Sequence, residues 1–501
     1  MLLTEQLAVT ASARKADSEL IRISRRVFSF PVVLCALLVV LTVLTVRARF
    51  NDPDLWWHLK VGEIVWNTHT IPTTDLFSFT TNNHPWIPHE WLSEVLIYGA
   101  YKVGGYTGLM TWLCVFPSLL IIAAYTLSSL YSGNAKVALL GALATWLFAT
   151  VGLAIRPHII GYLLLTCELL IVHLGRTRDR RWFLLLPPMF AVWVNCHGSF
   201  FFGLAVLAVF LFCSFLDFRI GSLVCTRWDT RQRKMLAVVF ALSVAALFIN
   251  PVGLKQATYP IDVMTNQTTG LTAVDEWQPL KFDNPRDFAV LGFAGLLFLI
   301  TLLRRTDMHL EELLIVGAGF GLAVLHTRMI FVFGIVAAPV LCRLLSDTWE
   351  KYDPARDRRL PNLVMMVLSL IAIGMGFPRL NELEQQVRQG NPVKAVEFLR
   401  SSGMSGRMLN EYVYGGYLIW SAPEHKVFID GRADVYDWTG VLQDYGAWAT
   451  LQQEPEVLLK KYKIDFCLLQ RQSPMSRVLP YIPGWKMVYS DDVSNIFAKV
   501  R

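Results

Sequence analysis

The sequence predicts an α-helical polytopic membrane protein that ends in a small C-terminal α/β domain outside the cytoplasm. Hydrophobic residues make up 54% of the 501 residues and charged residues only 17%, whereas soluble proteins carry about 25% charged residues. The apolar residues also gather in runs close to the ~20 residues that a helix needs to cross a bilayer. The mean hydropathy of +0.42 agrees with this class.

About eleven apolar runs predict transmembrane helices, because backbone polar groups in lipid need partners within their own segment. The fifth run is short for a complete crossing. The predicted helices lie near residues 28–46, 107–131, 137–154, 159–175, 182–195, 199–217, 235–250, 287–303, 310–325, 329–345 and 361–377.

Lysine and arginine residues predict the orientation of these helices. The N-terminal tail and alternate connections hold 21 of them, against about nine in the connections on the other side, which indicates a cytoplasmic N-terminus in the inner (plasma) membrane. The net charge of +7 therefore reflects topology, and no nucleic-acid partner is expected. We predict a cytoplasmic tail (1–27), a transmembrane domain (28–378) with outer loops at 47–106 and 251–286, and an extracytoplasmic domain (379–501).

The last 120 or so residues are too polar to span a bilayer and show mixed patterns. "NPVKAVEFLRSSG" predicts a helix that ends at Gly403. "KVFID" and "IDFCLLQ" predict buried strands, and "WKMVYSDDVSNIFAKV" predicts a terminal hairpin. The eight cysteines are scattered and form no C-x-x-C pair, so the sequence predicts neither a disulfide framework nor a zinc site.

Unusual polar clusters all fall at outer helix ends or in outer loops of this topology. Ionisable residues at membrane depth are costly and usually face an interior cavity. We therefore predict a single polar chamber that opens to the outside. The clusters are "DPDLWWH" (52–58), "HEW" (89–91), "RPH" (156–158), "NCHGS" (195–199), "NP" (250–251), "DEW" (275–277) and "HTR" (326–328).

Three acidic residues of the first outer loop are candidate catalytic groups: Asp54, Asp52 and Glu90. A carboxylate within hydrogen-bond reach of an acceptor hydroxyl can remove its proton, and Asp54 is our first choice. Asp52 is equally consistent with a helix cap that precedes Pro53 at the first helical position. The three carboxylates together are also candidate ligands for a divalent cation, although their spacing is not diagnostic and no cofactor is certain.

Four arginines lie at outer helix ends, against the general bias of positive residues towards the cytoplasm. They are Arg47, Arg49, Arg156 and Arg328. A guanidinium matches a phosphate group through two parallel hydrogen bonds, so Arg156 and Arg328, and less clearly Arg49, are candidates for binding a lipid phosphate. Snorkelling to lipid headgroups explains such positions equally well.

Aromatic and histidine side chains in the same clusters are candidate substrate-binding groups, since sugar rings need flat apolar surfaces and hydrogen-bonding partners. An interfacial belt explains the tryptophans equally well. In "FIDGRADVY", Asp430, Arg432 and Asp434 are candidates for closing over the chamber or fixing the outer domain, and the favoured interpretation is an Asp-Gly turn braced by an ion pair. The candidate substrate-binding groups are Trp56, Trp57, His58, His89, His158, His197 and Glu276.

Over most of residues 28–501 the sequence resembles the bacterial polytopic proteins related to the GT-C glycosyltransferases, the superfamily of protein mannosyltransferases and aminoarabinose transferases. The resemblance rests on "DPDLWWHLKVGE", "PWIPHEWLSEVLIY", "IRPHIIGYLL", "WVNCHGSFFFGL", "INPVG", "DEWQP" and "VFIDGRADVY". It implies an acid in the first outer loop, which falls on Asp54 with Asp52 as its rival. The sequence departs from the mannosyltransferase pattern, because Asp-Pro-Asp replaces adjacent Asp-Glu.

The resemblance implies a membrane glycosyltransferase that moves a sugar from a polyprenyl-phosphate donor to an envelope acceptor, which would be a glycan, a lipid or a protein. The alternative is a non-catalytic envelope assembly protein that binds a glycolipid or polysaccharide. A transporter ranks last, because it would favour charged residues at mid-membrane and paired half-repeats.

Overall fold

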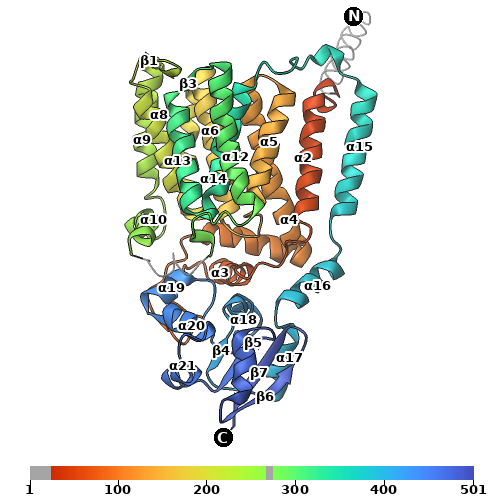
Figure 1. The fold of residues 1–501 in the computed structure, drawn as a ribbon, viewed down its shortest axis with the longest axis vertical. Helices are drawn as coiled ribbons and strands as arrows, with labels where there is room; N and C mark the ends of the chain where they lie inside the picture. The colour runs from red at the N-terminus through yellow and green to blue at the C-terminus, as the bar shows by residue number, and fades with distance from the viewer. Residues whose placement is uncertain (1–23, 267–274, 501) are drawn as a thin grey trace, which may run out of the picture.

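The computed structural model describes residues 24–266 and 275–500. A bundle of long helices forms one part of the molecule, and a smaller domain that contains the C-terminus lies against one end of the bundle (Figure 1). This arrangement confirms the predicted fold class of a polytopic helical protein with a small α/β domain at its C-terminal end.

Each predicted transmembrane segment overlaps a helix, and the short fifth segment combines the 3-10 turn η1 (Arg180–Leu185) with α7. The helices of the bundle are α2 (Phe30–Val46), α4 (Trp91–Ser132), α5 (Ala135–Ala149), α6 (His158–Thr177), α7 (Leu186–Cys196), α8 (Phe200–Cys213), α9 (Thr230–Ala246), α12 (Pro285–Arg304), α13 (Leu310–Leu325), α14 (Ile330–Leu344) and α15 (Arg359–Gly376).

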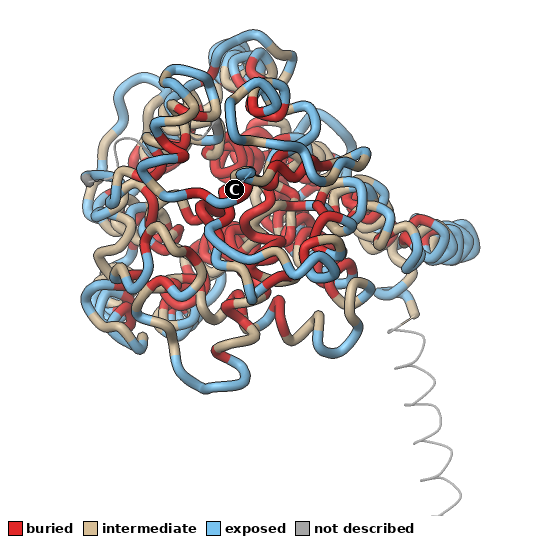
Figure 2. The backbone as a smooth tube through the Cα atoms, turned by 90° about the horizontal axis from the view of Figure 1, so that it is seen from below, coloured by how far each residue is buried: buried red, intermediate tan, exposed pale blue. Residues whose placement is uncertain are grey.

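Five helical segments of the described chain are both long and apolar enough to cross a membrane: 91–132, 158–177, 285–304, 327–344 and 359–376. Their burial differs according to their place in the bundle. The apolar window of 327–344 is 83% buried, whereas that of α15 is only 11% buried. Figure 2 shows the buried backbone at the centre and α15 exposed at the edge. Exposed apolar helices of this kind suit contact with lipid tails.

Helix α3 (Leu55–Thr68) and the first part of α4 cross the end of the bundle that faces the C-terminal domain (Figure 1). Helix α4 changes direction at Gly105, whose φ of 55° and ψ of −137° lie outside the helical region. A glycine adopts such a conformation without the clash that a side chain would cause. The kink separates the first part of α4, which crosses the end of the bundle, from the span predicted to begin at residue 107.

The C-terminal domain contains a four-stranded sheet in the order β4-β5-β7-β6. Strand β4 (Met408–Asn410) runs parallel to β5 (Phe466–Gln470), which pairs with the terminal hairpin of β6 (Trp485–Ser490) and β7 (Ser494–Lys499). The surrounding helices are α16 (Leu380–Gly390), α17 (Val393–Ser402), α18 (Gly415–Ser421), α19 (Ala433–Trp438), α20 (Val441–Ala449), α21 (Pro455–Lys461) and α22 (Pro474–Val478).

The strand predicted at "KVFID" is wrong. This segment belongs to no strand, and Val427 makes only an isolated bridge with Ser78 of the first outer loop. Its apolar residues are buried because the segment lies between the loop and the domain, where Val427 exchanges backbone hydrogen bonds with Phe77 and Phe79. A buried apolar run can thus be a connection between two parts of the protein as well as a strand.

A second, smaller sheet lies at the opposite end of the bundle (Figure 1). The hairpin of β1 (Phe218–Ile220) and β2 (Leu223–Cys225) connects α8 to α9, and β2 pairs with β3 (Met308–His309) just before α13. The hairpin is thereby attached to the start of α13 in this otherwise helical part of the chain.

Candidate active site

A cavity of about 260 Å³, here called the main cavity, lies between the helical bundle and the C-terminal domain. Its walls come from the first outer loop, the starts of α6 and α8, helix α10 (Leu254–Asn266), the end of α13 and the loop before α19. Residues from six of the seven polar clusters named in the sequence line it, whereas Asn250 and Pro251 do not. Its polar lining includes Asp54, His58, His89, Glu90, Arg156, His158, Tyr162, His197, Tyr259, Arg328, Arg432 and Asp434.

Arg156 holds both aspartates of the "DPD" motif. Its Nε lies 2.9 Å from each carboxylate oxygen of Asp52, and its Nη1 lies 3.0 Å from Oδ2 of Asp54. Asp52 Oδ1 also accepts the backbone N–H of Asp54 at 2.9 Å. Asp52 is therefore fully engaged in holding its neighbours, and Asp54 is the aspartate of the pair that lines the main cavity.

Asp54 has the protonation behaviour of a base that works near neutral pH. Burial raises the pKa of its carboxyl to about 6, against the opposing effect of Arg156 and with further raising by Asp52 and Glu276. The group is then mostly ionised at pH 7 and still basic enough to accept a proton. Gly431 packs directly on this carboxylate, since a Cβ built at that position would lie 1.9 Å from Oδ1 of Asp54.

Glu90 forms a second acidic centre with two histidines. Its Oε1 lies 3.3 Å from Nε2 of His197 and 3.7 Å from Nε2 of His89. Burial raises the pKa of Glu90 to about 8, and burial together with Arg328 lowers the pKa of His89 to about 3. Near neutral pH, Glu90 is thus a protonated hydrogen-bond donor beside neutral imidazoles.

Arg328 is less tightly held than Arg156. Its Nη1 lies 3.7 Å from Oε2 of Glu276, and its guanidinium lies over the ring of Trp277 at 5.5 Å. Glu276 also lies 3.6 Å from Nη1 of Arg156, so it bridges the two arginines, yet its side chain is 48% exposed. Within residues 24–266 and 275–500, Glu276 is the acidic partner of Arg328, and at this distance and exposure it leaves the guanidinium able to bind an anion.

The C-terminal domain contributes Asp434, which accepts a hydrogen bond from the hydroxyl of Tyr259 at 3.1 Å. The ring of Tyr259 stacks on His89 with 3.8 Å between centroids. Arg432 fixes this segment, because it binds Asp430 and also Asp75 of the first outer loop, each at 2.8 Å. The "FIDGRADVY" motif therefore braces the domain and also closes one side of the main cavity.

Several other predicted residues have structural partners. Trp57 lines the main cavity and lies against the ring of His58 at 3.6 Å. His58 Nδ1 meets Glu94 at 3.0 Å, and Nε2 of His158 meets the carbonyl of Gly152 at 2.6 Å. These histidines line the cavity with one ring nitrogen already engaged.

Two candidate assignments, those of Trp56 and Arg49, are corrected by these positions. Trp56 is fully buried between Tyr106 and Tyr417, so its ring packs within the protein and offers no surface to a sugar. Arg47 pairs with Glu382 at 2.8 Å, and Arg49 donates to the carbonyl of Thr150 at the end of α5. Both arginines brace helix ends rather than contribute to the main cavity.

The three acids offered as metal ligands are held apart. Arg156 lies between Asp52 and Asp54, whereas Glu90 pairs with histidines. Among residues 24–266 and 275–500, one trio of potential ligand atoms lies within 4.8 Å of one another, and it consists of Cys213, Cys225 and Glu311. The donor set at the "DPD" motif thus fits a guanidinium in its present arrangement, and a divalent ion there would have to displace Arg156.

A second cavity of about 430 Å³ lies on the other side of the two arginines. It shares Arg156, His158, Tyr162 and Arg328 with the main cavity, and Asp52 and Glu276 also line it. Its remaining polar wall comes from the start of α12 and the segment before it, with Lys281, Asp283, Asn284, Arg286 and Asp287. The two arginines therefore line both cavities, and the second cavity differs from the main cavity by its wall from residues 281–287.

Sequence reasoning missed Tyr162, Tyr259 and the polar segment 281–287. Tyr162 lies one helical turn after His158, so the 3.6-residue periodicity of α6 was a signal for it. The segment carried a weaker signal, "KFDNPRD", whose Asn284 caps α12. Tyr259 had none, because α10 contains Pro260 and shows no strong pattern before the fold is known.

No protein-family model matches the sequence, and no curated protein sequence matches it either. Solved structures do share its fold. The oligosaccharyltransferase of Archaeoglobus fulgidus, tethered with an acceptor peptide containing the NVT sequon, has a TM-score of 0.54 at 13% identity. The aligned region covers 95% of this chain and 75% of the oligosaccharyltransferase.

ArnT from Cupriavidus metallidurans bound to undecaprenyl phosphate has a TM-score of 0.53 at 12% identity, covering 93% of this chain and 97% of ArnT. The arabinofuranosyltransferase AftD from Mycobacteria has a TM-score of 0.51 at 12% identity, and this chain spans only 41% of it. The chain therefore has the GT-C-like fold of these membrane glycosyltransferases, as its sequence motifs indicated.

Proposed function

We propose that this protein is a glycosyltransferase that transfers a sugar from a polyprenyl-phosphate donor to an envelope acceptor at the outer face of the inner membrane. The observation that carries the proposal is the meeting of Asp54, Arg156 and Arg328 in one cavity. The fold shared with ArnT bound to undecaprenyl phosphate supports the class of donor.

The reaction requires one bond to form and one to break. The acceptor hydroxyl oxygen attacks the anomeric carbon, the bond between that carbon and the phosphate oxygen breaks, and the polyprenyl phosphate leaves with the bonding electrons. Asp54 takes the hydroxyl proton, for which its raised pKa is suited. Arg328, with Arg156 behind it, stabilises the negative charge that develops on the leaving phosphate.

The lipid chain of the donor has an apolar route to the main cavity. Phe201, Phe202, Val263, Met264 and Leu322 line the cavity on its apolar side. Phe201 and Met264 are 37% and 53% exposed, so the apolar lining continues to the outer surface of the bundle. A polyprenyl chain that lies along these side chains would place its phosphate near Arg328.

The scheme assigns positive charge to protein groups, and a divalent cation remains a separate proposal for the same cavity. A cation held by Asp52, Asp54 and Glu90 would have to displace Arg156 from the two aspartates. Its requirement is measured by comparing turnover after chelation with turnover after Mg²⁺ or Mn²⁺ is restored.

The test separates binding from turnover in protein reconstituted in nanodiscs. Undecaprenyl phosphate serves as the binding probe, and a panel of undecaprenyl-phosphate monosaccharides with envelope extract as acceptor serves as substrate. Asp54→Asn is expected to retain lipid binding and to lose about 10²- to 10⁴-fold in release of undecaprenyl phosphate, measured by mass spectrometry. Arg328→Gln is expected to weaken lipid binding itself.

Asp492→Asn is the matched control, since its side chain is 95% exposed on the C-terminal domain. A wild-type rate in Asp54→Asn contradicts the assigned base. Wild-type protein that binds undecaprenyl phosphate and releases none from any donor supports the alternative, a glycolipid-binding assembly protein.

A further inference from the structure

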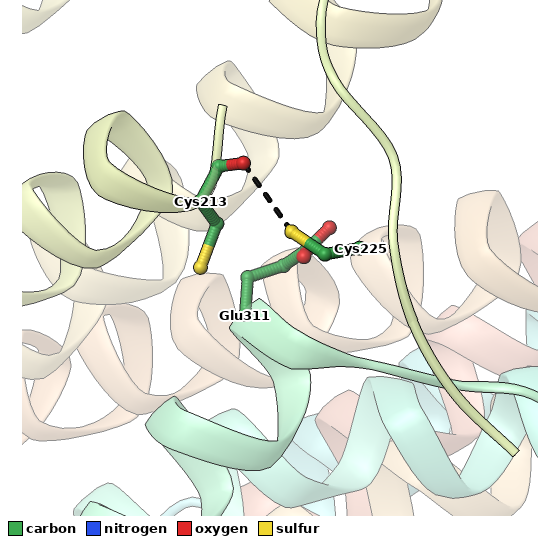
Figure 3. Close-up of side chains that lie close together, drawn as sticks. All are labelled: Cys213, Cys225 and Glu311. Carbon is green, nitrogen blue, oxygen red and sulfur yellow. Dashed lines mark hydrogen bonds between the residues drawn. The ribbon is translucent and has the colours of Figure 1, made fainter. Parts of the chain in front are cut away.

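Three polar side chains come together at the end of the bundle opposite the candidate active site. Cys213 ends α8, Cys225 ends strand β2, and Glu311 lies in the first turn of α13. Figure 3 shows the Cys225 sulfur next to the Glu311 carboxylate and hydrogen-bonded to the backbone carbonyl of Cys213. The sequence indicated no such cluster, because eleven residues separate the two cysteines and Glu311 is distant from both.

The three residues are nearly inaccessible, with relative exposures of 1%, 1% and 2%. Their ligand atoms all lie within 4.8 Å of one another. Around a tetrahedral Zn²⁺ with bonds of about 2.0–2.3 Å, neighbouring ligand atoms lie roughly 3.5–3.8 Å apart. Side-chain rotations that bring the atoms inward by about 1 Å would therefore close the cluster around one ion.

Arg176 supplies the support that a carboxylate ligand needs. Its Nη1 donates to Oε1 of Glu311 at 2.5 Å, and its guanidinium lies over the ring of Trp228 at 4.9 Å. A carboxylate has two oxygens, so one can bind a metal while the other keeps the arginine. Such outer partners orient metal ligands and tune their affinity.

The charges of the cluster also fit a divalent cation. Without metal, two neutral thiols accompany one Glu311–Arg176 ion pair, and Cys225 donates its S–H to the carbonyl of Cys213 at 3.3 Å. Binding would replace two thiol protons by one divalent ion. Two thiolates, one carboxylate, one guanidinium and the ion sum to zero, so the buried site is neutral in both states, which avoids the cost of burying a net charge.

We propose that Cys213, Cys225 and Glu311 form a binding site for one thiol-seeking divalent cation of the Zn²⁺ class, with water at the fourth position. The site joins the β1–β2 hairpin to the start of α13. Thiolate ligands select zinc over Mg²⁺ or Ca²⁺. This proposal is independent of the proposed function, because the site lies at the other end of the bundle.

The test titrates Cd²⁺ into the reduced, metal-free, full-length protein in detergent and records the ultraviolet absorption of the cadmium–thiolate bond. One equivalent is expected to saturate the signal, and Zn²⁺ is expected to abolish it by competition. Cys213→Ser and Cys225→Ser are each expected to lose the saturable signal. Arg176→Gln is expected to weaken Cd²⁺ binding by about ten- to a hundredfold.

Cys467→Ser is the matched control, because Cys467 is an equally buried thiol in the C-terminal domain. It is expected to bind Cd²⁺ as the wild type does. The proposal is overturned if the wild type shows no saturable absorption, or if the two serine variants retain it. It is also overturned if mass spectrometry of protein isolated without reductant finds Cys213 and Cys225 joined as a disulfide.

Discussion

Arg156 and Arg432 each bind two aspartates, but their surroundings differ. Arg432 binds Asp430 at 2.7 Å and Asp75 at 2.8 Å, and its side chain is 1% exposed. The rings of Trp86 and Phe77 cover its guanidinium at 4.6 and 4.9 Å. Arg156 binds its aspartates at similar distances, yet its side chain is 18% exposed and lines two cavities.

The difference teaches how one chemical arrangement serves two purposes. Arg432 borders the main cavity, but aromatic rings cover its guanidinium, so its ion pairs hold the C-terminal domain on the first outer loop. Arg156 keeps one face towards space that a substrate can enter. Solvent access and unused bonding capacity, rather than the residue types, separate a structural arginine from one placed for chemistry.

The largest expected effect is the loss of stability that follows from breaking the buried ion pairs of Arg432. Arg432→Met leaves two buried aspartates without a counter-charge, and removing one partner of a buried ion pair costs about 3–5 kcal/mol. We expect a large fall in the midpoint of thermal unfolding, measured in detergent. Arg400→Met is the control, since Arg400 pairs with Glu424 at the surface, where such pairs contribute about 0–1 kcal/mol. Equal destabilisation by both variants would contradict the comparison.

Arg156→Lys should separate activity from stability. An ammonium is a single point charge and cannot hold Asp52 and Asp54 through two nitrogens, as the guanidinium does. We expect release of undecaprenyl phosphate to fall by about a hundredfold or more, with a small change in unfolding temperature. For Arg432→Lys we expect the opposite balance, in which the loss of stability is the larger effect. An Arg156→Lys variant with full activity would exclude a role for the fork geometry.

The sequence predicted the helical architecture well, because apolar runs and charge bias are local signals. It also located the chamber, since "DPDLWWH", "HEW" and "RPH" all fell on one face of the predicted topology. It could not assign individual partners. Trp56 and Trp57 are adjacent and identical in type, yet only Trp57 reaches the main cavity, because successive positions of α3 face different sides of the helix.

Contacts between distant segments were the other limit. Nothing local connects Asp75 with Arg432, or Cys213 with Glu311, and each pair is brought together by packing of separate elements. The "KVFID" segment failed for the same reason, since it is buried between the first outer loop and the C-terminal domain without joining the sheet as a strand. Pattern analysis finds which residues are unusual, and the fold decides what they meet.

Gly431→Ala probes the position of Asp54 beside Arg156 by adding a single methyl group. The added Cβ would lie 1.9 Å from Oδ1 of Asp54, so the carboxylate must move. A displacement of about 1 Å in a catalytic group can cost roughly a hundredfold in rate, and we expect a loss of that order in turnover. Gly446→Ala in α20 is the matched control, because a Cβ there meets nothing within 4 Å. A variant with wild-type turnover would show that this carboxylate is not held in its catalytic position by Gly431.

The pH dependence of turnover is the finest test, because it compares Asp54 with Glu90 inside the main cavity. Asp54 must be ionised to accept a proton, so the rate should rise with pH through the Asp54 pKa of about 6. Glu90 loses its proton near its pKa of about 8, and the new negative charge would oppose an anionic phosphate, so the rate should fall above that pH. We expect a bell-shaped profile of turnover against pH. Glu90→Gln keeps a neutral side chain of the same shape and should remove the alkaline fall while leaving the acidic rise unchanged. A profile that keeps both limbs in Glu90→Gln would assign the alkaline limb to another group, and one without an acidic limb in the wild type would contradict Asp54 as the base.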